Sequence, residues 1–168
     1  RLFRRQRQMC IRDRYGTEAL STLRIEMGHV AGSELDGRTI PYDASLEGLV
    51  SKKKDFIGKR SLNRSAFTST DREKLVGVVP IDKTTSIPEG SYIVKDPKAK
   101  LPNPKLGHVS ASCWSVEYDN PFSLAIIKDG KNMIGQKLFA MSPLKNKTIP
   151  VEIVSSHYVD PEGKRVRS

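Results

Sequence analysis

Residues 74–80 read Lys-Leu-Val-Gly-Val-Val-Pro, and the character of the sequence changes at this run. Its β-branched residues favour a strand. Five further β-rich runs follow, at residues 91–94, 107–114, 122–128, 137–140 and 148–154. Turn sequences such as Pro-Glu-Gly, Asp-Asn-Pro and Lys-Asp-Gly separate them. Six short strands at this spacing predict a small antiparallel β-barrel or sandwich over residues 71–168.

The residues before this run follow a helical pattern instead. Leu20, Leu23 and Met27 recur at three- and four-residue spacing, Thr17 could serve as N-cap, and Gly28 offers a stop. Residues 55–62 predict a short helical turn capped by Asp55, and residues 65–71 have the polar composition of a linker. We therefore expect an α+β chain with a helical part over residues 15–70, followed by an all-β domain.

The first fourteen residues are set apart by composition. They hold six Arg and one Asp, and they show neither helical nor strand periodicity. Residues 9–14 resemble the translation of a sequencing adapter, so we expect a non-native segment and a natural chain interrupted at Tyr15. The alternative is a genuine basic tail without order.

Charge and hydropathy argue against two classes of function, nucleic-acid binding and membrane contact. The net charge is +10, but the first fourteen residues contribute +5 of it and most of the chain is nearly balanced. Basic residues interleaved with aromatic ones on a single face would be expected of a nucleic-acid binder, and we do not find them. The sequence has neither an apolar run of about 20 residues nor a signal peptide, so we expect a cytoplasmic protein without membrane contact.

Few residues suggest chemistry by themselves. The chain lacks a Gly-x-Gly-x-x-Gly loop, and its histidines lack metal-type spacing, so we predict no catalytic residue and no metal ligand. Ser155, Ser156 and His157 lie near Asp160, but adjacency in sequence is not triad geometry. We predict a structural role for His108 and a place in the core for Trp114. Arg24 and Glu26 are two apart on the predicted helix and therefore point to different sides.

Several ordered stretches together resemble the aminomethyltransferase family, specifically the branch at the C-terminal end of the α subunit of heterotetrameric sarcosine oxidases. They span nearly the whole chain from Tyr15, and each one is weak alone. The stretches are residues 15–28 (YGTEALSTLRIEMG), 52–62 (KKKDFIGKRSL), 107–115 (GHVSASCWS), 122–127 (FSLAII), 149–154 (IPVEIV) and 158–161 (YVDP).

This resemblance implies a fold and a cofactor. It implies the last part of a folate-binding lobe followed by a small β-barrel, with tetrahydrofolate as the acceptor of a one-carbon unit from sarcosine. FAD, FMN and NAD would belong to other parts of such a complex, whose partners would be the beta, gamma and delta subunits. By the same resemblance, Arg24 and Glu26 are expected to face the folate channel and to act by positioning and electrostatics.

Two departures from the family pattern leave alternatives open. Leu20 and Ser21 stand where typical members have an Arg-Asp pair, and residues 44–48 run directly to Leu49 without the usual Trp. Both departures favour the sarcosine oxidase branch over a stand-alone aminomethyltransferase or demethylase. The alternative from another class is a non-catalytic β-barrel interaction module.

Overall fold

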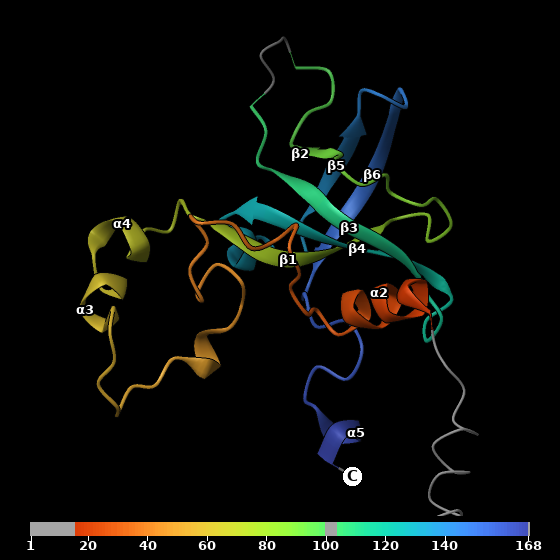
Figure 1. The fold of residues 1–168 in the computed structure, drawn as a ribbon. Coiled ribbons are helices and arrows are strands. Elements are labelled where there is room, and N and C mark those ends of the chain that lie inside the picture. Colours follow the sequence, from red (N-terminus) through yellow and green to blue (C-terminus); the bar gives the residue numbers. More distant parts are fainter. Residues whose placement is uncertain (1–15, 100–103, 168) are drawn as a thin grey trace, which may run out of the picture.

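The computed structural model describes residues 16–99 and 104–167, and a closed antiparallel barrel is its centre (Figure 1). Neighbouring strands follow the order β1-β4-β3-β2-β5-β6, and β6 closes the barrel against β1. The predicted barrel is confirmed, and each predicted strand end lies within about two residues of the observed one. The strands are β1 Glu73–Pro80, β2 Tyr92–Val94, β3 Gly107–Ser115, β4 Asn120–Lys128, β5 Lys137–Ser142 and β6 Lys147–Val154.

The barrel has two hydrophobic clusters because part of its wall is covered on both faces. One cluster fills the interior, with Val78, Ile93 and Ile153 among its members. The other lies outside, where Leu75, Phe122 and Leu124 pack against a helix. As a result, β1 and β4 are buried along almost their whole length, whereas β5 alternates between buried and more exposed residues.

The covering helix is α2, Thr17–Glu26, and its end is well defined. Met27 is the C-cap, Gly28 adopts a φ of 69°, and His29 N–H donates to the Arg24 carbonyl at 2.8 Å. This is a Schellman ending, in which a residue with positive φ lets two amides reach back into the last turn. A Cβ at Gly28 would also lie 2.5 Å from the Ser156 carbonyl oxygen, so the end of α2 packs closely on residues 155–159.

The start and the buried face of α2 differ from the sequence expectation. Gly16 occupies the N-cap position, and Thr17 is already the first helical residue. Leu20 and Leu23 are 51% and 54% exposed, and burial falls on Ile25 and Glu26. The apolar spacing identified the helix correctly, but its fully buried side chains lie only in the C-terminal turn.

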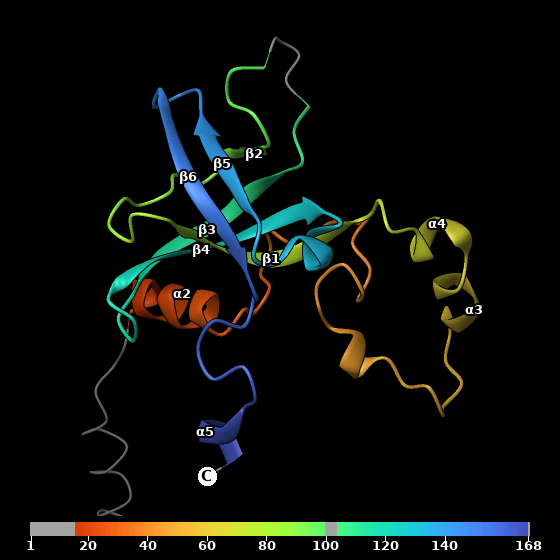
Figure 2. The ribbon, with the colours of Figure 1, turned by 180° about the vertical axis from the view of Figure 1, so that it is seen from behind.

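Between α2 and β1 the chain forms a long excursion with little regular structure (Figure 1; Figure 2 from behind). Its short helices are η1 Glu47–Leu49, α3 Lys59–Leu62 and α4 Ser65–Thr68. Asp55 does not cap α3, because Gly58, with a φ of 95°, holds that position. The predicted linker includes α4, so it is not wholly irregular. The domain boundary at residues 70–71 stays a prediction.

Two short helices complete the described chain: η2 Gly130–Met133 after β4, and α5 Lys164–Arg167 near the end. In the parts of the chain that the structure describes, no helix combines the length and apolarity needed to cross a membrane. The predicted basic tail, residues 1–14, lies outside the described residues.

Candidate functional site

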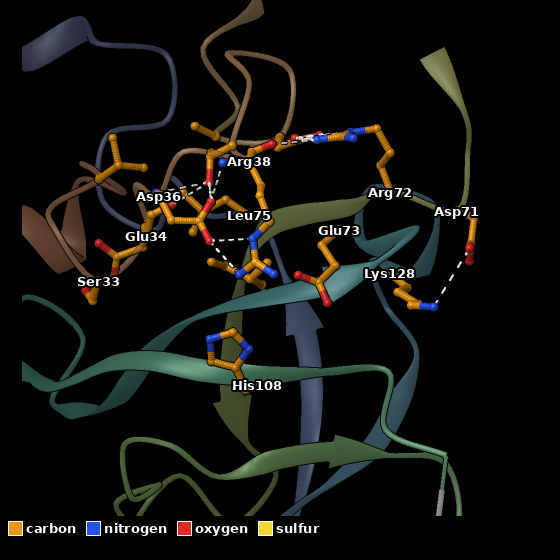
Figure 3. Close-up of a pocket in the computed structure, with 15 residues that line it drawn as sticks. Ser33, Glu34, Asp36, Arg38, Asp71, Arg72, Glu73, Leu75, His108 and Lys128 are labelled. Carbon is orange, nitrogen blue, oxygen red and sulfur yellow. Dashed lines mark hydrogen bonds and ion pairs between the residues drawn. The ribbon is translucent and has the colours of Figure 1, made fainter. Parts of the chain in front are cut away.

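A polar cavity of about 590 Å³ lies on the outer wall of the barrel (Figure 3). The segment between α2 and η1 forms one side of it, and the start of β1 with parts of β3 and β4 forms the other. Carboxylates and cations both line it, among them Glu34, Asp36, Arg38, Arg72 and Lys128. The cavity therefore offers hydrogen-bond acceptors and donors in one place.

Asp43 anchors the covering segment to β1. Its buried carboxylate accepts hydrogen bonds from Arg72 Nε at 3.0 Å and from Lys74 Nζ at 3.2 Å. Its backbone carbonyl accepts the Leu75 N–H at 2.7 Å. Burial alone would raise the pKa of Asp43, but the hydrogen bonds from Arg72, Ile40 and Lys74 and the charge of Arg72 lower it overall. The segment is thus held to the strand by an ionised group.

Glu34 forms the inner wall of the cavity and connects it to α2. One carboxylate oxygen accepts the Ala31 N–H at 2.7 Å and faces Arg24 Nη1 at 3.3 Å, and the other accepts the Ser33 hydroxyl at 2.8 Å. Burial opposes ionisation of Glu34, but hydrogen bonds from Ala31, Ser110 and Ser33 and the charge of Arg24 lower its pKa. Arg24 therefore stands directly behind the cavity wall.

The outer part of the cavity carries more exposed charges. Asp36 and Arg38 pair at 2.6 Å, and hydrogen bonds from Arg38 lower the pKa of Asp36 to about 2. Asp71 and Lys128 are 3.8 Å apart at the rim. His108, on β3, also lines the cavity, as Figure 3 shows. Sequence reasoning did not select any of these residues for a site. These residues come together only because residues 30–44 fold over the barrel wall, and no local sequence pattern predicts that contact.

Glu26 takes a different position from Arg24. Its buried carboxylate accepts the Ser115 hydroxyl at 2.7 Å and the Val116 N–H at 3.0 Å. Its backbone carbonyl accepts the N–H groups of Tyr158 and Val159. The two predicted site residues thus point to different sides, and only Arg24 contacts a residue that lines the cavity. Glu26 fixes the end of α2 to the end of β3 and to residues 158–159.

Two other sequence interpretations meet different outcomes. Trp114 is 48% exposed, and its indole N–H donates to Asp119 at 3.1 Å, so the predicted core position is wrong. It lies near the end of β3, where the side chain is open to solvent. The Asp160 carboxylate accepts hydrogen bonds from the backbone N–H groups of Lys164 and Arg165 at the start of α5, a contact that is not that of a catalytic triad.

Among residues 16–99 and 104–167, no group of three His, Cys, Asp or Glu side chains could hold a metal ion.

Comparisons with known proteins place this geometry in context. No family model matches the chain. It is 38% identical over 154 residues to the sarcosine oxidase subunit alpha of Rhizobium meliloti (strain 1021), and equally identical over the same length to that of Corynebacterium sp. (strain P-1). These matches cover 90% of the chain but only 16% of each relative.

A second group of proteins shares the fold. The chain is 27% identical over 140 residues to the aminomethyltransferase of Thermosipho melanesiensis, covering 83% of the chain and 36% of that protein. The crystal structure of the glycine cleavage system aminomethyltransferase T from Bartonella henselae superimposes with a TM-score of 0.68 at 22% identity. That match covers 84% of this chain and 38% of the other, and it shows the shared fold.

Proposed function

We propose that this chain, a homologue of sarcosine oxidase alpha subunits with the fold of an aminomethyltransferase, serves tetrahydrofolate-linked transfer of the one-carbon unit released from sarcosine. The observation that carries the proposal is the 38% identity that extends over 90% of the chain. Because the chain spans only 16% of the length of these relatives, the activity of a whole enzyme is itself part of the proposal.

The residues around the cavity suit a folate. A folate presents N–H donors and a carbonyl on its pterin and carboxylates on its glutamate end. Asp36 and Arg38 pair with each other in the free chain, and Lys128 faces Asp71 at the rim, so a folate would exchange these exposed pairs for contacts with its N–H donors and its carboxylates. When bound, tetrahydrofolate supplies the nitrogens that accept the one-carbon unit. The fit rests on the donor and acceptor set and implies no particular pose.

Within this proposal the chain positions its ligand rather than transferring protons. The Ala31 N–H, two serine hydroxyls and the charge of Arg24 together keep Glu34 ionised in the cavity wall. Asp43 keeps residues 30–44 closed over β1. Glu26 fixes the orientation of α2, on which Arg24 stands. Fixed charges that need no reorganisation favour productive binding geometry. We assign FAD, FMN and NAD, with the beta, gamma and delta subunits, to the rest of the complex.

The test separates folate coupling from amine oxidation in the full-length enzyme that contains this chain. We expect Glu26→Ala to reduce formation of methylene-tetrahydrofolate severalfold while sarcosine oxidation stays nearly unchanged. Glu18→Ala is the matched control, because Glu18 lies exposed on the same helix. Sarcosine turnover and methylene-tetrahydrofolate are measured in the same reaction. Equal loss of both activities, or loss of neither, would contradict a role of Glu26 in folate coupling.

One observation favours a second candidate function, that of a non-catalytic interaction module. Leu20 and Leu23 leave an apolar strip of α2 open, and exposed apolar strips often mark contact surfaces. If the full-length protein showed no measurable affinity for tetrahydrofolate while it assembled normally with its partners, the interaction module would be the better assignment.

A further inference from the structure

A second cavity, of about 910 Å³, lies inside the excursion between η1 and α3. Four lysines line it: Lys52, Lys53, Lys54 and Lys59. The excursion projects to one side of the barrel in both ribbon views (Figures 1 and 2). We call residues 51–59 the lysine loop.

The lysine loop is held in shape by its own contacts. Lys59 Nζ donates to the carbonyl oxygens of Lys54 at 2.7 Å and Lys52 at 3.4 Å, and it lies 6.0 Å from the centre of the Phe56 ring. The Lys54 N–H donates to the Ser51 hydroxyl at 2.9 Å. One cation therefore closes the loop, and the three consecutive lysines Lys52–Lys54 line the cavity while staying exposed.

Those three ammonium groups form no salt bridge with another described residue, although Asp55 follows them directly in the loop. Among the described residues, no carboxylate lies within salt-bridge distance of Lys52, Lys53 or Lys54, whereas Lys74, Lys128 and Lys131 all have acidic partners. Glu47, which also lines the cavity, is paired with Lys131. Adjacent like charges repel, and the closed loop keeps these three close together. A bound multivalent anion would reduce this electrostatic repulsion.

The rest of the cavity narrows the class of anion. Tyr42, Val50 and Leu62 line it as well as the lysines, so apolar side chains and cations share one cavity. A chain of γ-linked glutamates has the matching composition, with a carboxylate on each unit and methylene groups between them. Its carboxylates can pair with the ammonium groups while its methylenes lie on the apolar side chains.

The two cavities flank one stretch of chain. Tyr42 lines the cavity of the lysine loop, and the next two residues, Asp43 and Ala44, line the polar cavity on the barrel wall. A ligand with its pterin in the polar cavity could thus extend its tail past residue 42. We propose that the lysine loop binds the poly-γ-glutamate tail of a folate whose pterin occupies the polar cavity, an inference that rests on the proposed function.

The test compares tail length in the full-length protein that contains this chain. The probes are 5-formyltetrahydrofolate with one glutamate, the same folate with five, and free penta-γ-glutamate. We expect the pentaglutamyl folate to bind about tenfold or more tightly than the monoglutamyl form, as a few partly exposed ion pairs allow. This preference should shrink when the salt concentration is raised from about 0.05 to about 0.5 M, since exposed charges are screened.

The decisive variant replaces Lys52, Lys53 and Lys54 with Gln. It should lose the preference for the longer tail while its affinity for the monoglutamyl folate and its melting temperature stay unchanged. The matched control replaces Lys83, Lys145 and Lys147 with Gln, which removes the same charge from exposed positions that do not line the cavity. The control should keep the full preference.

Other outcomes separate this inference from the proposed function. If the wild-type protein bound both folates equally, or if the triple variant kept the preference, the lysine loop would not be a tail site while the folate proposal would survive. If neither folate bound but penta-γ-glutamate bound in a manner that requires Lys52–Lys54, the anion site would stand and the folate proposal would fall. Tighter binding of single-stranded DNA than of penta-γ-glutamate would overturn the assignment of the loop to a glutamate chain.

Discussion

Cys113 shows how burial and a neighbouring charge together set the reactivity of a thiol. The thiol is half-buried on β3, and burial first, with the Glu26 carboxylate second, raises its pKa to about 12. Since only the thiolate attacks, Cys113 should react with a disulfide reagent at pH 8 on the order of a hundred- to a thousandfold more slowly than a free cysteine. The measurement is stopped-flow labelling in a Cys10→Ser background.

The same residue offers a check on Glu26. Replacing Glu26 with Gln removes the negative charge near the thiol, so the pKa of Cys113 should fall and labelling should accelerate. Glu117→Gln is the comparison, because Glu117 pairs with Arg165 and is not among the groups that shift Cys113. Equal labelling rates in both variants would mean that the Glu26 carboxylate does not act on the thiol.

At the scale of elements, α2 shows that apolar residues at helical spacing are not all buried. Ile25 packs with Leu75 and Phe122 on the barrel wall, whereas Leu23 is largely exposed. Ile25→Ala should therefore lower the free energy of unfolding by about 2–4 kcal/mol. Leu23→Ala should change it by about 0.5 kcal/mol or less, because little apolar area is lost and Ala favours a helix. Urea denaturation of both variants measures the difference, and similar losses would contradict the observed face of α2.

The contribution of Asp43 to stability should depend on pH. Asp43 has a pKa below its ordinary value of 3.8 in the folded chain, so the unfolded chain binds more protons at acidic pH. Its contribution to stability is therefore present above pH 3.8 and is lost as the pH falls through the lower, folded-state pKa. Asp43→Asn should destabilise the chain at pH 7, and its difference from wild type should narrow toward pH 3.

The control for that experiment is Asp71→Asn. Asp71 lies at the cavity rim, is largely exposed, and faces Lys128 at 3.8 Å. Exposed pairs of this kind contribute about 0–1 kcal/mol, so the variant should follow the wild-type curve at every pH. If the gap between wild type and Asp43→Asn stayed constant with pH, the Asp43 carboxylate would not titrate as its contacts require.

The strands and the wall of the polar cavity differ in how far the sequence could predict them. The strands were predictable because each contains β-branched or aromatic residues and has a turn signal within ten residues or so. The wall of the polar cavity was not, since it depends on contacts such as Asp43 with Leu75, which are far apart in the chain. Arg24 was proposed as a site residue through resemblance and helix spacing, and its role stays a prediction. Asp36, Arg38 and His108 carry no local signal that assigns them to one cavity.

At the scale of the whole molecule, residues 155–159 connect the helix to the barrel. The Tyr158 ring stacks on Phe122 with centroids 4.2 Å apart, and its hydroxyl interacts with Asn120. Its backbone N–H donates to the Glu26 carbonyl at the end of α2. One residue thus contacts the last turn of α2, the start of β4 and the outer hydrophobic cluster, which should make helix and barrel unfold together.

Tyr158 variants test that cooperativity. Tyr158→Ala should cost about 2–4 kcal/mol through lost packing, and Tyr158→Phe about 0.5–1.5 kcal/mol through the lost hydroxyl contact. Tyr92→Ala on β2 is the control, because that ring is 40% exposed and should cost much less. Far-UV circular dichroism follows the secondary structure, and Trp114 fluorescence follows the end of β3. Coincident transitions in wild type and in all three variants indicate one cooperative unit, whereas an earlier loss of helical signal in Tyr158→Ala would show that α2 can detach while the barrel stays folded.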